Sequence, residues 1–104
     1  MAQVLSPEIV VLENDLKVRL LGIKEKPEAR QAAIDYLVQK TRGEQVFLKF
    51  DNEKYDENGI LLCYLYLSNK TFLNAHLIKA GLVDADDRTQ YKYAKKFSAL
   101  RKAE

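Results

Sequence analysis

Residues 8–28 read EIVVLENDLKVRLLGIKEKPE, and this stretch contains most of the signals that decide the fold. Two apolar runs rich in Val, Ile and Leu flank the pair Asn14 and Asp15, and the second run alternates apolar with charged residues. This pattern predicts a β-hairpin with its turn at that pair. Gly22 falls inside the second strand, where a missing side chain favours a bulge or a sharp bend. The stretch therefore predicts a small sheet that curls.

A helix is predicted after this hairpin. Pro27 suits a first helical turn because the N–H that proline lacks is not needed there, so we predict a helix over residues 27–41. Ala33 and Leu37 recur at helical spacing and would pack on the sheet. Gly43 can adopt a positive φ and is expected to end the helix.

The remaining pattern completes an α+β fold. Residues 60–67, ILLCYLYL, are apolar on both faces and predict the most buried strand. The other predicted elements are strands at 45–50 and 71–73, a short helix at 74–80 capped by Asn74, an acidic capping region at 84–87, and a final helix at 88–102. Two strands, a helix, three strands and two helices in this order fit a five-stranded, partly open β-barrel of the OB type, with one inserted helix and two C-terminal helices.

Composition favours one small globular domain. Of the 104 residues, 47% are hydrophobic and 31% are charged, so we expect a single folded domain over residues 1–104. The longest apolar runs are only as long as a strand, which excludes the roughly 20-residue span that a bilayer needs, and no signal sequence opens the chain. We therefore expect a cytoplasmic protein with no membrane partner. The single cysteine, Cys63, allows neither an internal disulfide nor a cysteine metal cage.

Charge alone does not decide the function. The chain has 17 Lys and Arg against 15 Asp and Glu, a net charge of +2. Proteins that bind mainly through phosphates usually carry a stronger basic bias. The cations nevertheless form two clusters along the chain: Lys17, Arg19, Lys24 and Lys26 in the first, and Arg88, Lys92, Lys95, Lys96, Arg101 and Lys102 in the second.

Several short stretches resemble the staphylococcal nuclease-like (thermonuclease) family, in the family's order and with nearly its spacing. They are VRLLGI at 18–23, PE at 27–28, VFL at 46–48, DENG at 56–59, LCYLYL at 62–67 and FLNAHLIKAGL at 72–82. The resemblance spans residues 8–82 and is specific for the fold. It implies the OB-type barrel and a function connected with nucleic acid.

The same resemblance implies that the nuclease site is incomplete. Active members hold one calcium ion with acidic side chains, place a glutamate beside the attacking water, and neutralise the scissile phosphate with two arginines. Arg19 matches the first arginine and Glu28 the glutamate, but Ile60 stands where the second arginine should follow Gly59. Lys24 stands at one metal-binding position, and Glu8 is at best the other. We therefore expect no catalytic residues, no metal site and no cofactor.

Structural roles compete with functional ones for each of these residues. Arg19 and Glu28 could pair as an ordinary salt bridge, His76 fits a helix surface, and Cys63 fits an inert core position. The acidic run 51–57 is expected to be a solvated turn rather than a calcium loop. Aromatic side chains could stack on bases, although strand aromatics of a small barrel more often belong to its core: Phe47, Phe50, Tyr64 and Tyr66.

We expect a catalytically inactive domain that binds nucleic acid, more specifically DNA, weakly and as an accessory module. Its binding residues would be Lys17, Arg19, Lys24 and Lys26, which lie near the family's substrate face. Two alternatives stay open: a divergent metal-dependent nuclease that uses Arg19 and Glu28, and a domain that binds only other proteins. The segment also resembles tail domains of some prokaryotic DNA N4/N6-type methyltransferases, which implies a fragment of a longer chain with its catalytic domain elsewhere.

Overall fold

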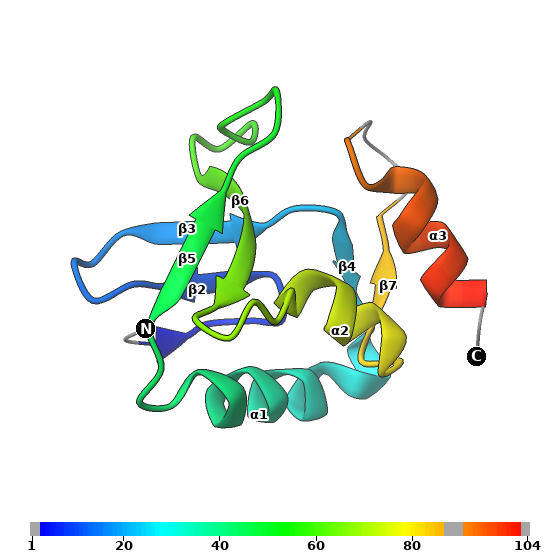
Figure 1. Ribbon diagram of the computed structural model, residues 1–104, viewed down its shortest axis with the longest axis horizontal. Helices are drawn as coiled ribbons and strands as arrows, with labels where there is room; N and C mark the ends of the chain where they lie inside the picture. Colours follow the sequence, from blue (N-terminus) through cyan, green and yellow to red (C-terminus); the bar gives the residue numbers. More distant parts are fainter. Residues whose placement is uncertain (1–2, 87–90, 103–104) are drawn as a thin grey trace.

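A computed structural model describes residues 3–86 and 91–102 of the chain (Figure 1). Its strands are β1 (Gln3–Val4), β2 (Ile9–Val11), β3 (Lys17–Leu20), β4 (Ile23–Glu25), β5 (Val46–Lys49), β6 (Leu61–Leu67) and β7 (Val83–Ala85). Its helices are the short 3₁₀ helix η1 (Pro27–Ala29) and the α-helices α1 (Arg30–Thr41), α2 (Leu73–Lys79) and α3 (Ala94–Lys102). Within the described ranges, no helix combines the length and the apolar character that crossing a membrane would require.

The strands form two sheets. Five of them pair in the order β1-β2-β3-β6-β5, and β4 pairs with β7 in a separate two-stranded sheet. Strands β3 and β6 run parallel, with Arg19 opposite Leu62, whereas the other pairs are antiparallel. The α+β class is thus confirmed. The expected partly open barrel is not confirmed, because the described strands divide into these two sheets.

The predicted hairpin and the predicted bend at its end are both confirmed. Strands β2 and β3 pair with Val11 opposite Lys17, and Asp15 in the turn adopts a φ of 64°. Gly22 has a φ of 86°, and the chain bends there, so the second strand of the predicted hairpin is divided into β3 and β4. The predicted helix is also present, with the 3₁₀ turn η1 at its start and Ala33 buried on its inner face.

Three predictions for the second half of the chain are wrong. Asn74 does not cap α2, because it lies one residue inside the helix and is fully buried. The strand predicted at 71–73 is absent, because Phe72 forms only an isolated bridge with Tyr66 and Leu73 already begins α2. Asp84 belongs to β7 rather than to a capping region, and residue 87 of that region lies outside the described residues. The last helix begins at Ala94; residues 88–90 of the predicted helix lie outside the described residues. Strand β1 had no clear signal in the sequence.

Strand β6 lies at the centre of the core, as its apolar sequence predicts. Leu65 and Cys63 are fully buried, and burial raises the pKa of the Cys63 thiol to about 12, which suits an inert core residue. On the other face of the strand, the buried Tyr64 ring makes edge contacts with Tyr93 and Phe97 at centroid distances of 4.9 and 6.5 Å. These contacts hold α3 against the sheet beside β7 (Figure 1).

Candidate functional site

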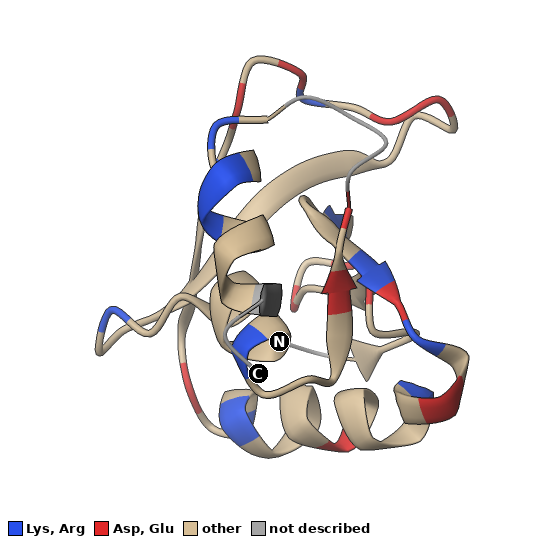
Figure 2. Ribbon diagram, turned by 90° about the vertical axis from the view of Figure 1, so that its right-hand side faces the viewer, with Lys and Arg blue, Asp and Glu red and all other residues tan. Residues whose placement is uncertain are grey.

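A cleft of about 610 Å³ opens beside the bend between β3 and β4. The loop that follows β5 forms its opposite wall, together with Asp86 after β7. Six of its described lining residues are acidic and one is basic: Glu8, Asp51, Glu53, Asp56, Glu57 and Asp86 against Arg19. Figure 2 shows acidic residues along the loops and on β7, and basic residues on α3 and β4. The cleft itself is therefore strongly negative, which opposes the entry of a phosphate.

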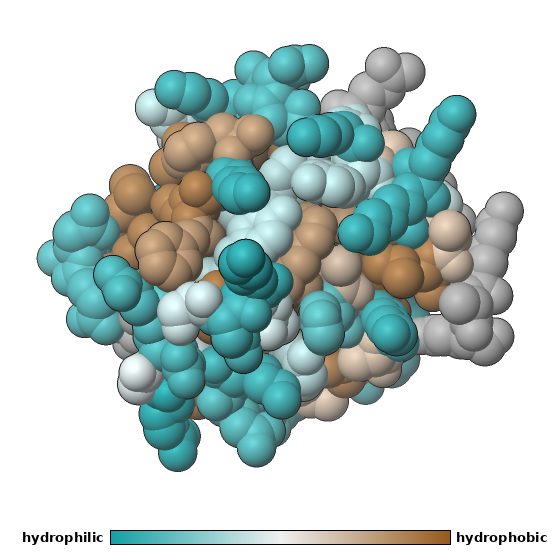
Figure 3. Space-filling model, in the orientation of Figure 1, coloured by the Kyte–Doolittle hydropathy of each residue, from teal (hydrophilic) through white to brown (hydrophobic). Residues whose placement is uncertain are grey.

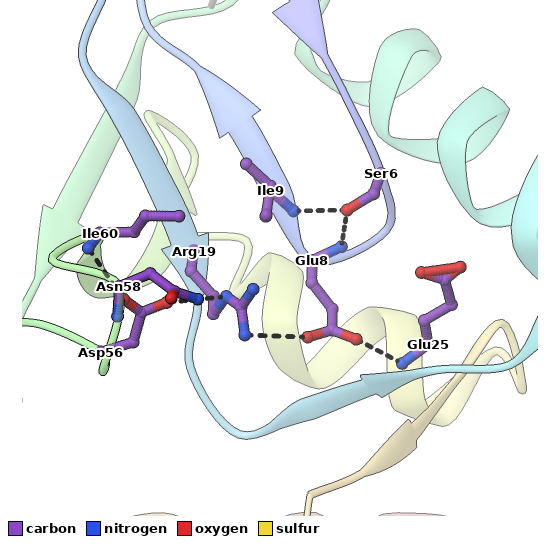
Figure 4. Close-up of polar contacts among 8 residues, drawn as sticks. All are labelled: Ser6, Glu8, Ile9, Arg19, Glu25, Asp56, Asn58 and Ile60. Atoms are coloured by element: carbon purple, nitrogen blue, oxygen red, sulfur yellow. Dashed lines mark hydrogen bonds and ion pairs between the residues drawn. The ribbon is translucent and has the colours of Figure 1, made fainter.

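Arg19 is held between two carboxylates inside this cleft (Figure 4). Its Nε lies 3.3 Å from Oδ2 of Asp56, and its Nη1 lies 3.8 Å from Oε1 of Glu8. Arg19 Nε and Asp56 Oδ2 are both buried, and neither forms a hydrogen bond with good geometry to a described residue. The ion pair between them therefore compensates for their loss of contact with water. The Arg19 side chain is 31% exposed, and a phosphate that approaches its guanidinium would be repelled by these two carboxylates. Arg19 therefore pairs with Glu8 and Asp56 rather than with Glu28, the partner that the structural alternative named.

Backbone groups fix both carboxylates in place. Asp56 Oδ1 accepts hydrogen bonds from the backbone N–H groups of Asn58 and Ile60, each at 2.8 Å, and so closes its own turn. Glu8 Oε2 accepts a 2.9 Å hydrogen bond from the backbone N–H of Glu25. Both acids are thus positioned toward Arg19 by the fold, and Ile60, at the position where the resemblance implies a second arginine, contributes its backbone N–H to this arrangement.

The structure separates the four cations that the sequence grouped. Arg19 lies in the cleft, whereas Lys17, Lys24 and Lys26 are not among its described lining residues. Lys17 on β3 and Lys24 on β4 are exposed. Lys26 is half-buried, and its Nζ donates a hydrogen bond of 3.3 Å to the backbone oxygen of Gly81. Lys17 and Lys24 therefore remain the two accessible members of the predicted binding set.

The residues present do not fit the calcium site of the active nucleases. Lys24 stands where the resemblance implies a metal ligand, and the neighbouring Glu25 is paired with Arg30 at 2.5 Å. Glu28 lies exposed in η1, outside the described lining of the cleft. In the part of the chain that the structure describes, no three His, Cys, Asp or Glu side chains are grouped to hold a metal ion.

Asp51 ties the acidic loop to the segment before α3, a link that sequence reasoning missed. Its Oδ2 accepts hydrogen bonds from the Tyr64 hydroxyl at 2.5 Å and from the Lys92 backbone N–H at 2.7 Å. The hydrogen bond from Tyr64 is the main cause that lowers the pKa of Asp51. Burial and the same carboxylate raise the pKa of Tyr64. No local pattern pairs these residues, because they meet only when the loop folds over β6.

We expect Asp51→Asn to lower the free energy of unfolding by about 1 to 2 kcal/mol at pH 7, because hydrogen bonds to a charged acceptor are stronger than those to an amide. The lowered pKa in the folded state means that this stabilisation is present above the ordinary value of 3.8 and is lost as the pH falls through the folded-state pKa. Urea unfolding between pH 7 and pH 3 should therefore show that the difference in the free energy of unfolding between Asp51→Asn and the unmodified chain becomes smaller as the pH falls. A difference that is constant with pH would contradict this role, and Glu53→Gln on the same loop is the control.

A comparison with protein families reports one match, to the family described as staphylococcal nuclease homologue, over residues 17–104. The matched region begins at β3 and contains Arg19, Glu28 and Ile60. A search of curated proteins finds no match. The family match covers most of the chain and extends beyond the stretches that carried the resemblance in sequence. The chain therefore belongs to the staphylococcal nuclease homologue family.

Proposed function

We propose that this chain is a nucleic-acid-binding accessory module of the staphylococcal nuclease-like OB type that no longer hydrolyses its ligand. The observation that carries the loss of hydrolysis is the state of Arg19, whose charge is compensated by Asp56 and Glu8. The family membership supports a function connected with nucleic acid. A DNA-modifying enzyme, such as a methyltransferase, is the kind of catalytic domain that such a module would serve.

Phosphodiester hydrolysis requires positive charge where negative charge develops in the transition state. Here the second arginine is replaced by Ile60, one metal-ligand position is occupied by Lys24, and the remaining arginine faces carboxylates. Removing a single group that stabilises a developing oxyanion typically costs about 3 kcal/mol of activation free energy, or a factor of roughly 100 in rate. Several such losses together leave no productive site.

We expect no cleavage of DNA or RNA above background in the presence of Ca²⁺, Mg²⁺ or Mn²⁺. The measurement is a gel assay of single- and double-stranded oligonucleotides incubated with the purified chain. Cleavage that requires a metal ion and disappears in Glu28→Gln, but persists in the control Glu44→Gln, would revive the divergent nuclease. Glu44 is exposed like Glu28 and lies after α1, so its substitution controls for the lost charge.

The two exposed cations of the predicted set are the first candidates for phosphate contacts. Lys17 and Lys24 both carry charges that are open to solvent. So few contacts would give a weak affinity, in the roughly 10⁻⁴ to 10⁻⁶ M range of non-specific binding, and a modest dependence on salt. Sequence preference would be slight, because contacts to phosphates carry no base information.

A further inference from the structure

A row of four aromatic side chains crosses the surface between β5 and the start of α3. Phe47 on β5 lies directly opposite Tyr66 on β6, so the two side chains share one face of the sheet. The Tyr66 ring stacks on Phe72 with a centroid distance of 4.5 Å and an interplanar angle of 15°. Phe72 contacts Tyr93 at 5.2 Å. We call these four residues the aromatic row.

The aromatic row is only partly withdrawn from water. Phe47 is 48% exposed, although a strand position next to a core strand would usually be covered. The other three rings are half-buried. Figure 3 shows hydrophobic surface in the region of β5, which hydrophilic side chains interrupt toward α3. Phe47 and Phe50 thus differ from the core role that strand aromatics usually take, since Phe50 is also 46% exposed.

The ammonium groups of two lysines lie over rings of the aromatic row. Lys49 Nζ lies 5.1 Å from the centroid of the Tyr66 ring. Lys96 Nζ lies 5.8 Å from the Phe72 centroid and 5.7 Å from the Tyr93 centroid. Both lysines are exposed, and neither pairs with a carboxylate among the described residues. These cation–π contacts are weak at exposed sites, so the ammonium groups can turn to an incoming anion.

We infer that single-stranded nucleic acid binds along the aromatic row, with bases stacked on its rings and phosphates on Lys49 and Lys96. This inference rests on the proposed function and names the surface that would bind the nucleic acid. An aromatic surface edged by lysines is the combination that binds single strands, because every base has a face that can stack and every nucleotide carries a phosphate. Duplex DNA keeps its base faces inside the helix and can use only the lysines.

Charge supports this face over the acidic cleft as the binding surface. The described lining of the cleft carries six carboxylates and only Arg19 as a cation. Beside the aromatic row, Lys92 adds a third exposed cation, with its Nζ 5.5 Å from the Tyr93 ring. Asp51, which accepts hydrogen bonds from Tyr64 and from the Lys92 backbone, sets one negative charge against these three cations. A polyanion is therefore attracted to the aromatic row and repelled by the cleft.

The test is a fluorescence-anisotropy titration of a labelled oligothymidine and of a duplex of equal length, at two salt concentrations. The variants are Phe47→Ala, the pair Lys49→Ala with Lys96→Ala, and the pair Lys17→Ala with Lys24→Ala, which tests the phosphate contacts that the sequence predicted instead. We expect Phe47→Ala to weaken single-strand binding at least fivefold with an unchanged salt slope, because it removes stacking and no charge. The Lys49 and Lys96 pair should weaken binding about tenfold and lower the log–log salt slope by about 1.4.

The outcomes separate the inference from the function on which it rests. Absence of any binding by the unmodified chain at low salt would overturn both and favour a domain that binds only proteins. Binding that is lost in the Lys17 and Lys24 pair but kept in Phe47→Ala would overturn the inference alone. Equal affinity for duplex and single strand would also overturn it. Thermal unfolding followed by circular dichroism establishes that each variant is folded, which the exposure of these side chains favours.

Discussion

Asn74→Ala should lower the free energy of unfolding by about 3 to 5 kcal/mol, a large share of the stability of a domain of this size. The Asn74 side chain is fully buried, its Oδ1 accepts a 2.8 Å hydrogen bond from the Leu65 N–H, and its Nδ2 donates one of 2.8 Å to the Leu21 oxygen. Truncation to alanine removes the side-chain partner of two buried backbone groups. Each buried group that is left without a hydrogen bond costs about 1 to 3 kcal/mol. The Cys63 oxygen, a weaker acceptor at 3.4 Å, keeps its bond from the Leu21 N–H.

Urea unfolding of Asn74→Ala beside His76→Ala measures this effect. His76 lies on the same helix but is exposed, so its substitution should change the free energy of unfolding by less than about 0.5 kcal/mol. A loss in Asn74→Ala no larger than that of the control would mean that the bonds of Asn74 do not support the fold. Because Leu21 lies between β3, which carries Arg19, and the bend at Gly22, the same substitution should also loosen this wall of the cleft.

Gly22→Ala is the second substitution with a large expected effect, and it should lower the free energy of unfolding by about 3 to 4 kcal/mol. Gly22 has a φ of 86°, which side chains tolerate poorly at a cost of about 1 to 2 kcal/mol. A Cβ there would also lie 2.6 Å from the Phe97 ring and 2.7 Å from the Tyr91 ring. Phe97 is fully buried, so it has little room to move, and overpacking of this kind typically costs a further 1 to 3 kcal/mol.

Gly43→Ala is the matched control for Gly22→Ala. Gly43 has a φ of 70°, but nothing lies within 4 Å of an added Cβ, so only the backbone term of about 1 to 2 kcal/mol applies. The difference between the free energies of unfolding of the two variants therefore measures the cost of the clash with the Phe97 and Tyr91 rings. Amide hydrogen exchange should show loss of protection in α3 for Gly22→Ala alone. Equal destabilisation of the two variants would contradict the close packing of α3 on the bend.

Local signals account for what the sequence predicted correctly. The turn at Asp15, the bend at Gly22 and the helix start at Pro27 each depend on the backbone preferences of one or two residues. The role of Asn74 could not be predicted in this way. A polar residue before an apolar run is a common helix cap, but its partners Leu21 and Leu65 come from strands that only the tertiary fold brings together.

The candidate site shows the same limit. The family pattern identified Arg19, but its partners Glu8 and Asp56 lie 11 positions before it and 37 after it, and no periodicity joins them. The exposure of Phe47 could not be predicted either. An alternating pattern of residues predicts a strand, but it does not say which face of that strand another element will cover. The sequence thus predicted the elements better than it predicted the electrostatic state of the site.

Binding without cleavage is the central claim, and one measurement tests it most directly. A labelled single-stranded oligonucleotide is titrated with the chain at low salt in the presence of Ca²⁺, and its anisotropy is followed for several hours. We predict a rise in anisotropy that corresponds to a Kd of roughly 10⁻⁴ to 10⁻⁶ M, remains constant with time and falls when salt is added. An absent rise, or a rise that decays as the oligonucleotide is shortened, would contradict the account.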